Sequence, residues 1–553
     1  MPCENEWRIF GPPGTGKTTW LARQIRHAAA RYSPDNVLAA SFTKVAALEL
    51  RGRDLPIPSD RVGTLHSICY HALGGHLPIA ETKPWIESWN EAQPGFALSG
   101  ATSESDVDEP FGDERVGERE GDRLLRLANV YRARLLPEEH WPMMAVRAFW
   151  RRWCDWKTEH GLIDFTDMIE RALQEIPVAP GDPRVGCFDE VQDFTALELS
   201  VCRQWAGHME YVLLVGDDDQ SIFSFKGCDA RAFLEPPIPD ERKIPLKQSY
   251  RVPAVIHRLA SRWISGVSRR ERKIYQPRDA DGEVTRMPDD VAWGNAEAVV
   301  DRLLVDYDRY DDTASAHKFF LLTSCAYMLR DLQDALRQAG VPFHNPFRRK
   351  RRDWNPLWSG GRDRLSILDR LMAYLRPLST IWGRDARMWT VEDVQAWLPL
   401  LRSEGVLQRG AKMAVARMDK ETRERTVTLD ELEQWFDPPA LAASMQGSVT
   451  WLLGHALSDA AQKLRYPAQI LKRFGGRVLR EPPKVVIGTI HSTKGAECDE
   501  AWLFPDLSPS GAEEWEQSVE GRDAIIRQFY VGMTRARERL VLCAPNTRNC
   551  VEL

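Results

Sequence analysis

Residues 11–18 carry the pattern G-x-x-x-x-G-K-T, a glycine-rich turn followed by a lysine and a hydroxyl residue. Glycines let backbone N–H groups turn inward onto phosphate oxygens, Lys17 adds a point charge, and the Thr18 hydroxyl can ligate Mg²⁺. The loop therefore predicts a nucleotide-phosphate site, and a plain strand-to-helix turn is the alternative. Phosphate contacts are expected from Gly11, Pro12, Pro13, Gly14, Thr15, Gly16, Lys17, Thr18 and Thr19.

Acidic residues end the apolar run 185–188. Asp189 can hold Mg²⁺ together with Thr18, and the adjacent Glu190 can activate the water that attacks the γ-phosphate. Open α/β sheets place their ligand chemistry at the carboxyl ends of strands. The pair therefore predicts a division of labour between metal and nucleophile, with a solvated acidic turn as the alternative.

The apolar run 211–215 also ends in acidic residues, at 217–219. Gln220 follows them and can face the γ-phosphate. Phe223 and Phe225 then alternate with small polar residues. An aromatic ring beside a nucleotide site can stack a base, which contributes about 1–3 kcal/mol. Taken alone, the two rings fit a hydrophobic core better than a stacking site, and both interpretations stay open here.

The elements that must position these residues alternate between strand and helix. Strands are expected at 7–10, 36–42, 185–188, 211–215, 319–323, 485–489, 502–504 and 540–543. Helices are expected at 18–32, 43–51, 123–136 and 143–158, and the stretches 70–184 and 363–479 read mainly as helix. This pattern predicts two α/β domains with parallel sheets, each interrupted by a helical insertion.

Composition narrows the class of protein. The 553 residues exceed what one core normally supports, so two or more domains are expected. No run of about 18 apolar residues occurs, and we expect a cytoplasmic protein with no membrane partner. The ten cysteines form no C-x-x-C pair, which favours reduced thiols over a metal site. The net charge of −6 means that any nucleic-acid binding uses local patches.

Several motifs, taken in order, resemble one family. The stretches 41–47, 63–67, 162–168, 246–251, 489–497 and 530–537 resemble, one after another, the motifs of UvrD/Rep-type superfamily 1 (1A) DNA helicases. The resemblance implies two RecA-like motor domains in tandem. The implied bounds are 1–70 and 185–243 for the first motor, 71–184 for its insertion, 244–360 and 480–553 for the second motor, and 361–479 for a reduced second insertion.

The resemblance also implies roles for individual residues. Tyr250 is expected to stack on adenine, Glu497 to approach the nucleotide sugar, and Arg251 and Arg535 to meet the γ-phosphate. The catalytic set is then Lys17, Asp189, Glu190, Gln220, Arg251 and Arg535. The expected DNA contacts are Phe42, Thr43, Thr64, His66, Phe223, Phe225, Thr489 and His491.

The function implied is an ATP-dependent 3′→5′ translocase and helicase on single-stranded DNA, with ATP and Mg²⁺ as cofactors. Expected partners are single strands, single-to-double-strand junctions and other replication, repair or defence proteins. The expected location is the cytoplasm, either with the nucleoid or, for a viral protein, in the host. Two alternatives remain: a DNA-stimulated regulatory ATPase or motor subunit that does not unwind, and an ATPase without a nucleic-acid function.

The sequence departs from the family pattern at several places. Lys226 stands where an arginine is usual, and Lys keeps the charge but loses the planar fork. Ala496 and Cys498 replace a leucine and an aromatic residue, and only six residues precede Trp7, where the family has a glutamine segment that reads adenine. The contacts to the DNA strand and the selectivity for adenine are therefore the least defined features.

Two loops and a set of tryptophans complete the expectations. The acidic stretch 99–121 reads as a mobile surface loop, and the basic run 347–352 reads either as a contact to DNA phosphates or as a solvated loop. Trp141, Trp150, Trp153 and Trp156 have the spacing of residues that pack helices together, so we expect a core there rather than base stacking.

Overall fold

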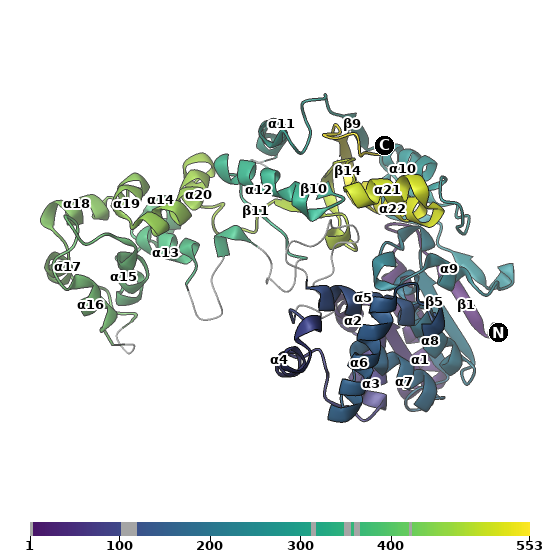
Figure 1. Ribbon diagram of the computed structural model, residues 1–553. Coiled ribbons are helices and arrows are strands. Elements are labelled where there is room, and N and C mark those ends of the chain that lie inside the picture. Colours follow the sequence, from purple (N-terminus) through teal and green to yellow (C-terminus); the bar gives the residue numbers. More distant parts are fainter. Residues whose placement is uncertain (1–3, 101–118, 311–316, 348–354, 359–364, 420–422) are drawn as a thin grey trace. The chain divides into compact units, whose positions relative to one another are not determined.

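The computed structural model describes residues 4–100, 119–310, 317–347, 355–358, 365–419 and 423–553 (Figure 1). Residues 101–118 of the acidic loop and 348–352 of the basic run lie outside these ranges. The chain divides into two compact units. Unit 1 comprises Met1–Met287, Leu322–Ala326 and Thr489–Leu553, and unit 2 comprises Pro288–Leu321 and Tyr327–Gly488. The domain bounds stated above stay predictions.

A six-stranded sheet with the order β3-β2-β4-β5-β1-β6 organises the first part of unit 1. All of its pairings are parallel. The strands are β1 Glu6–Phe10, β2 Val37–Ser41, β3 Val62–Thr64, β4 Val185–Asp189, β5 Tyr211–Gly216 and β6 Lys243–Pro245. The register sets Ser41 beside both Thr64 and Asp189, so the carboxyl ends of three strands meet at one edge.

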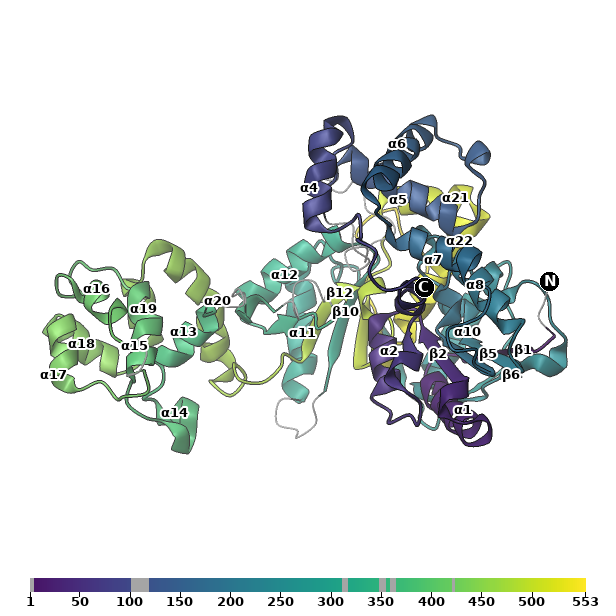
Figure 2. The same ribbon diagram turned by 90° about the horizontal axis from the view of Figure 1, so that it is seen from below.

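Both faces of this sheet are buried, as is typical of parallel sheets. Along β2, Val37 and Ala39 join one core cluster, whereas Leu38 and Ala40 join another. Helices α1 and α2 contribute to the first cluster and α3, α7 and α8 to the second. Figure 2 shows α1 and α2 together beside β2. Their bounds are α1 Lys17–Tyr32, α2 Lys44–Arg51, α3 Leu65–Ala72, α7 Phe165–Glu175 and α8 Ala196–Ala206.

Between α3 and α7 lies a helical insertion with its own core. It contains α4 Lys83–Ala92, α5 Glu120–Ala133 and α6 Met144–His160. Trp89 and Trp153 are fully buried there, with ring centroids 4.9 Å apart in an edge-to-face arrangement. Trp141 and Trp156 are also buried, and Trp150 packs against the cluster. The predicted core role of the tryptophans is confirmed.

The remaining elements of unit 1 contain or flank the segments that resemble the later motifs. They are α9 Ala230–Leu234, β7 Gln248–Pro253, α10 Ala254–Ile264, β8 Gln276–Arg278, β9 Glu283–Arg286, β13 Cys498–Leu503, α21 Pro509–Gln517, α22 Val519–Met533 and β14 Ala536–Leu542. The strands β13 and β14 begin four residues before the predicted starts at 502 and 540, because polar residues open both strands and hide them from an apolar pattern.

Unit 2 is mainly helical. Figure 1 shows α13 to α20 gathered together, in the stretch that the sequence pattern predicts as helix. The elements are α11 Ala296–Arg309, β10 Phe319–Thr323, α12 Leu329–Gln338, β11 Phe343–His344, α13 Ile367–Tyr374, α14 Ser379–Trp382, α15 Val391–Trp397, α16 Ala411–Ala416, α17 Leu429–Trp435, α18 Pro438–Met445, α19 Val449–His455, α20 Ser458–Phe474 and β12 Val485–Thr489. The last residues of β10 and β12 are assigned to unit 1.

A second sheet has the strand order β11-β12-β10-β13-β14-β9. The pairs β11·β12, β13·β14 and β14·β9 are parallel. Two α/β sheets in tandem confirm the predicted fold class of two RecA-like motor domains. In the described ranges, no helix combines the length and apolarity needed to cross a membrane. The described cysteines are free thiols, as expected.

Candidate active site

The phosphate loop joins β1 to α1. The Gly11 N–H donates to the Gly216 carbonyl at 2.8 Å, which ties the start of the loop to the end of β5. Gly14 and Gly16 have φ values of 72° and 73°, in the left-handed region that favours glycine. Lys17 Nζ donates to the Gly11 carbonyl at 2.9 Å, so the ammonium lies back over the loop with two further N–H donors. This arrangement fits a cradle for phosphate oxygens.

Thr18 and Asp189 come together where α1 starts and β4 ends. The Thr18 hydroxyl donates to Asp189 Oδ2 at 3.2 Å. Burial, and next the Glu190 carboxylate, raise the pKa of Asp189 to about 7. A divalent cation would favour the ionised carboxylate. Because Mg²⁺ prefers oxygen ligands and keeps several waters, this hydroxyl and carboxylate fit it.

Glu190 is held in an uncommon backbone conformation next to this pair. Its φ is 54°, which few residues other than glycine adopt. Its carboxylate accepts a hydrogen bond from Gln192 Nε2. Burial opposes its ionisation, but the charges of Lys17 and then Lys494 lower its pKa. Glu190 is therefore ionised beside the phosphate loop, as a general base requires.

The end of β5 carries a buried acidic cluster. The side chains of Asp217, Asp218 and Asp219 are at most 1 % exposed, and all three form ion pairs with Lys273. Gln220 Nε2 donates to Asp217 Oδ2 at 2.7 Å, which fixes the amide at this end of the strand. The aspartates thus position Gln220 and bind a lysine from the segment after α10.

Strand β7 lies directly on the phosphate loop. The Tyr250 N–H donates to the Gly14 carbonyl at 2.8 Å, and the Ser249 hydroxyl donates to the Pro13 carbonyl at 2.7 Å. Tyr250 itself is 69 % exposed, with its ring available for stacking. Arg251 Nε donates to Glu497 Oε2 at 2.8 Å. The structure therefore brings the predicted adenine, γ-phosphate and sugar residues to the loop.

Arg535 reaches the same site from the end of α22. It is 1 % exposed and donates to the carbonyls of Val531 and Ala496 and to Gln220 Oε1, at 2.9, 3.1 and 3.3 Å. Burial, and next the charge of Arg251, lower the pKa of Arg535 to about 9. A buried guanidinium that donates to neutral oxygens is suited to receive an anion.

Four of the predicted DNA-contact residues form an aromatic cluster. Phe42 stacks on Phe223 with ring centroids 6.0 Å apart, Phe223 meets Phe225 at 5.9 Å, and Phe225 meets His491 at 5.7 Å. Phe223 is 8 % exposed, whereas Phe42 and Phe225 are partly exposed. Burial lowers the pKa of His491 to about 3, so the imidazole is neutral. In this cluster, Phe223 and His491 are buried, whereas the rings of Phe42 and Phe225 are partly exposed to solvent.

Of the other predicted DNA contacts, the three threonines make local hydrogen bonds to the backbone. Thr43 and Thr64 cap α2 and α3, since each hydroxyl accepts from the N–H three residues later. Thr489 is 2 % exposed and accepts in the same way from the Ser492 N–H at 3.3 Å. His66 lies 3.5 Å from Glu198. Their predicted contacts with DNA stay predictions.

Two lysines were missed as site residues. Lys494 Nζ donates to Asp193 Oδ1 at 2.6 Å and to the Gln220 carbonyl at 2.6 Å. Lys273 holds the acidic cluster. The basic run 269–273 was a signal for the second, because three adjacent buried carboxylates need cations. Lys494 gave no signal beyond its place in the motif at 489–497.

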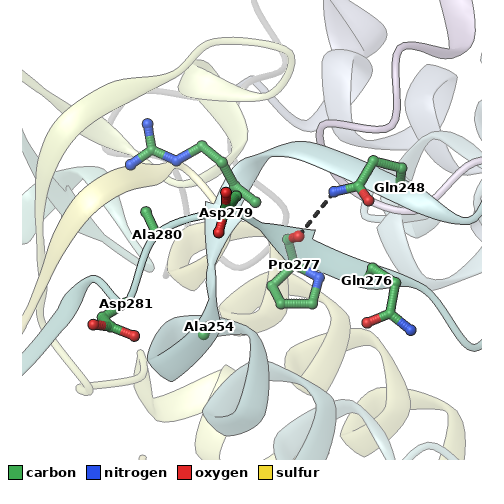
Figure 3. Close-up of a pocket in the computed structure, with 8 residues that line it drawn as sticks. Gln248, Ala254, Gln276, Pro277, Asp279, Ala280 and Asp281 are labelled. Carbon is green, nitrogen blue, oxygen red and sulfur yellow. Dashed lines mark hydrogen bonds between the residues drawn. The ribbon is translucent and has the colours of Figure 1, made fainter.

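A pocket of about 370 Å³ lies beside β7 and β8 (Figure 3). It is lined by Gln248, Ala254 and residues 276–281. Gln248 Nε2 donates to the Pro277 carbonyl at 2.8 Å, the bond dashed in Figure 3. None of the predicted site residues lines it. The candidate chemistry therefore lies outside this pocket.

Comparison with known families is consistent with this site. The model of the UvrD/REP helicase N-terminal domain matches residues 2–237, and that of the UvrD-like helicase C-terminal domain matches residues 410–547. Together they match more than half of the chain. Both matched ranges hold residues of the site.

Similar proteins include several helicases. DNA helicase II of Salmonella typhimurium is 26% identical over 98% of this chain and 82% of its own length. DNA helicase II of Escherichia coli is 26% identical over 61% of this chain and 48% of its own length. ATP-dependent DNA helicase UvrD1 of Mycobacterium tuberculosis is 24% identical over 61% of this chain and 47% of its own length. The chain thus spans about half the length of the last two.

Proposed function

The chain belongs to the UvrD/Rep-type superfamily 1 DNA helicases, and from this premise we propose that it is an ATP-dependent 3′→5′ translocase that steps along single-stranded DNA and unwinds duplexes. The observation that carries the proposal is the convergence of Lys17, Asp189 and Glu190 with arginines from distant segments. Arg251 lies beside Gly14, and Arg535 donates to Gln220.

The residues divide the work of ATP hydrolysis. Loop amides and Lys17 would hold the β- and γ-phosphates of ATP, and Thr18 and Asp189 would hold Mg²⁺, whose charge would stabilise the phosphates during transfer. Glu190 takes the proton of the attacking water. Gln220 and the two arginines orient and stabilise the γ-phosphoryl group, an effect worth roughly 10³–10⁵ in rate for arginines in related reactions.

DNA contact is assigned to the aromatic cluster and the strand ends around it. Stacking tolerates any base, because every base presents a π-face. Exposed ring surface at Phe42 and Phe225 is available for this, while Phe223 packs against Phe42 and His491 packs against Phe225. Thr43, Thr64, His66 and Thr489 are the proposed contacts to the strand at neighbouring positions. The 3′→5′ direction rests on the family resemblance.

ATP hydrolysis measured with and without oligo-dT tests the proposal. We expect single strands to raise the wild-type rate many-fold, Lys17→Ala to abolish turnover, and Phe225→Ala to lower the ratio of stimulated to unstimulated rate. Arg231→Ala, an exposed residue paired with Asp229, is the control and should behave as wild type. An ATPase that needs Lys17 but ignores DNA would contradict the assignment of the aromatic cluster.

A DNA-stimulated regulatory ATPase is the second candidate. The short second insertion favours it, because the helices after α12 fill only about 110 residues, from Ile367 to Phe474. Such a motor would show the same DNA-stimulated hydrolysis but would not separate strands. Strand displacement on a tailed duplex distinguishes the two functions.

A further inference from the structure

Lys494 connects two segments of the candidate site, one that follows β4 and one that follows β5. Its side chain is 11 % exposed, and Nζ donates to both carboxylate oxygens of Asp193, just beyond β4. The same ammonium donates to the Gln220 carbonyl, beyond β5, at 2.6 Å. One cation from the segment after β12 therefore binds the ends of two strands of the first sheet.

A short chain of hydrogen bonds leads from Lys494 to the catalytic carboxylate. Asp193 Oδ2 also accepts from Gln192 Nε2 at 3.1 Å. The same amide nitrogen donates to Glu190 Oε2, and Gln192 Oε1 accepts from the Asp217 N–H at 2.9 Å. Asp193 and Glu190 are thus joined through a single side chain, that of Gln192.

Lys494 also contacts the aromatic cluster. Its Nζ lies 4.9 Å from the centroid of the Phe223 ring, within the range of a cation–π interaction. Gln220, whose carbonyl it binds, is three residues before that ring and bears the amide that accepts from Arg535. The ammonium that holds Asp193 is therefore also in contact with the aromatic cluster.

We propose that Lys494 is a positioning residue that couples base stacking at the aromatic cluster to the orientation of Glu190. The inference rests on the proposed function, since it assumes hydrolysis at Glu190 and stacking at the cluster. The physical path is a series of direct contacts, which joins Phe223, Lys494, Asp193, Gln192 and Glu190 in that order. In this path a bound strand places Glu190 for proton removal, so loss of the lysine lowers DNA stimulation.

The test separates coupling from DNA affinity. Lys494→Met removes the charge and keeps the aliphatic length, and Asp193→Asn breaks the same ion pair from the other side. Lys226→Met is the matched control, because Lys226 Nζ also lies 4.9 Å from the Phe223 centroid. Each variant's ATPase rate is measured over a series of oligo-dT concentrations and divided by its own rate without DNA.

We expect Lys494→Met and Asp193→Asn each to lower the maximal stimulation by up to about 100-fold, the loss of rate expected when a catalytic group is misplaced by about 1 Å. The oligo-dT concentration for half-maximal stimulation should change little in both. Lys226→Met should raise that concentration and keep the maximum. The double variant should be no worse than either single variant, because both substitutions break one pair.

Failure of the proposed function and failure of the inference about Lys494 give different results. If oligo-dT does not stimulate the wild type, the proposed function fails and this inference with it. If the wild type is stimulated and Lys494→Met keeps the full maximum, the inference alone is overturned. It is equally overturned if Lys226→Met lowers the maximum as strongly. Should Lys494→Met not fold, Asp193→Asn decides by the same criterion.

Discussion

At the scale of single residues, neighbouring carboxylates differ because their surroundings differ. Burial and the charge of Glu190 raise the pKa of Asp189, whereas the lysines nearest Glu190 lower the pKa of Glu190. Pairs of titratable groups pushed apart in this way are typical of sites that divide acid, base and metal roles. The assignment of Asp189 to the metal and Glu190 to the water follows the same division.

His491 provides a test at this scale. Burial lowers its pKa to about 3, so the folded protein keeps a neutral imidazole while the unfolded chain takes up a proton near pH 6.5. Its contribution to stability is therefore present above pH 6.5 and is lost as the pH falls from 6.5 towards 3. The loss amounts to about 1.4 kcal/mol per pH unit.

We expect the midpoint of thermal unfolding of wild type to fall between pH 7.5 and pH 5.5 by more than that of His491→Gln. His76→Gln, at an exposed histidine, is the control and should follow wild type at both pH values. Equal pH dependence in wild type and His491→Gln would show that folding does not lower the pKa of this imidazole.

At the scale of elements, the close approach of β7 to the phosphate loop depends on Gly14. A Cβ there would lie 2.4 Å from the Cβ of Arg251, and the Gly14 carbonyl accepts from the Tyr250 N–H. The loop is thus shaped both for phosphate and for the strand that carries an arginine. A side chain at Gly14 would push β7 away and move Arg251 with it.

Gly14→Ala should therefore lower kcat of the ATPase by roughly 10³-fold or more, the scale expected when an arginine leaves the γ-phosphate. Gly161→Ala is the matched control. Gly161 has a φ of 65°, but nothing lies within 4 Å of a Cβ added there, so only the strain of about 1 kcal/mol is introduced. Steady-state kinetics and thermal unfolding separate the two effects, and similar losses of kcat in both variants would argue against the close-approach explanation.

At the scale of the whole molecule, unit 1 contains every residue assigned to ATP or DNA. The phosphate loop, β4, β5, β7 and residues from Thr489 onward all belong to it. The helices α13 to α20 belong to unit 2 and carry none of the predicted site. The proposed hydrolysis and strand contact are thus assigned to one unit.

Duplexes with single-stranded tails test the direction of movement. We expect ATP-dependent strand displacement from a duplex with a 3′ tail and little from one with a 5′ tail, because a 3′→5′ motor loads on the 3′ strand and runs into the duplex. Lys17→Ala controls for passive melting. Displacement from the 5′ tail alone would reverse the proposed polarity, and DNA-stimulated hydrolysis without displacement would favour the regulatory ATPase.

The sequence by itself determined the local elements and the chemistry at their ends. Strands β1, β2, β4 and β5 lie where apolar runs predict them, since periodicity and turn residues act between near neighbours. The phosphate loop and the acidic strand ends are likewise contiguous patterns. The family resemblance added Arg251 and Arg535, which no local pattern distinguishes from surface arginines.

Only the tertiary structure decided which buried charges are paired. Lys494 and Asp193 are 301 positions apart, and Lys273 binds three aspartates more than 50 positions away. The sequence around Lys494 does not indicate its partner, because a buried ion pair depends on which strand ends the fold brings together. The basic run at 269–273 indicates a cation for buried carboxylates, but not which carboxylates it meets. The threonines at 43 and 64 show the same limit, since their helix caps became visible only with the fold.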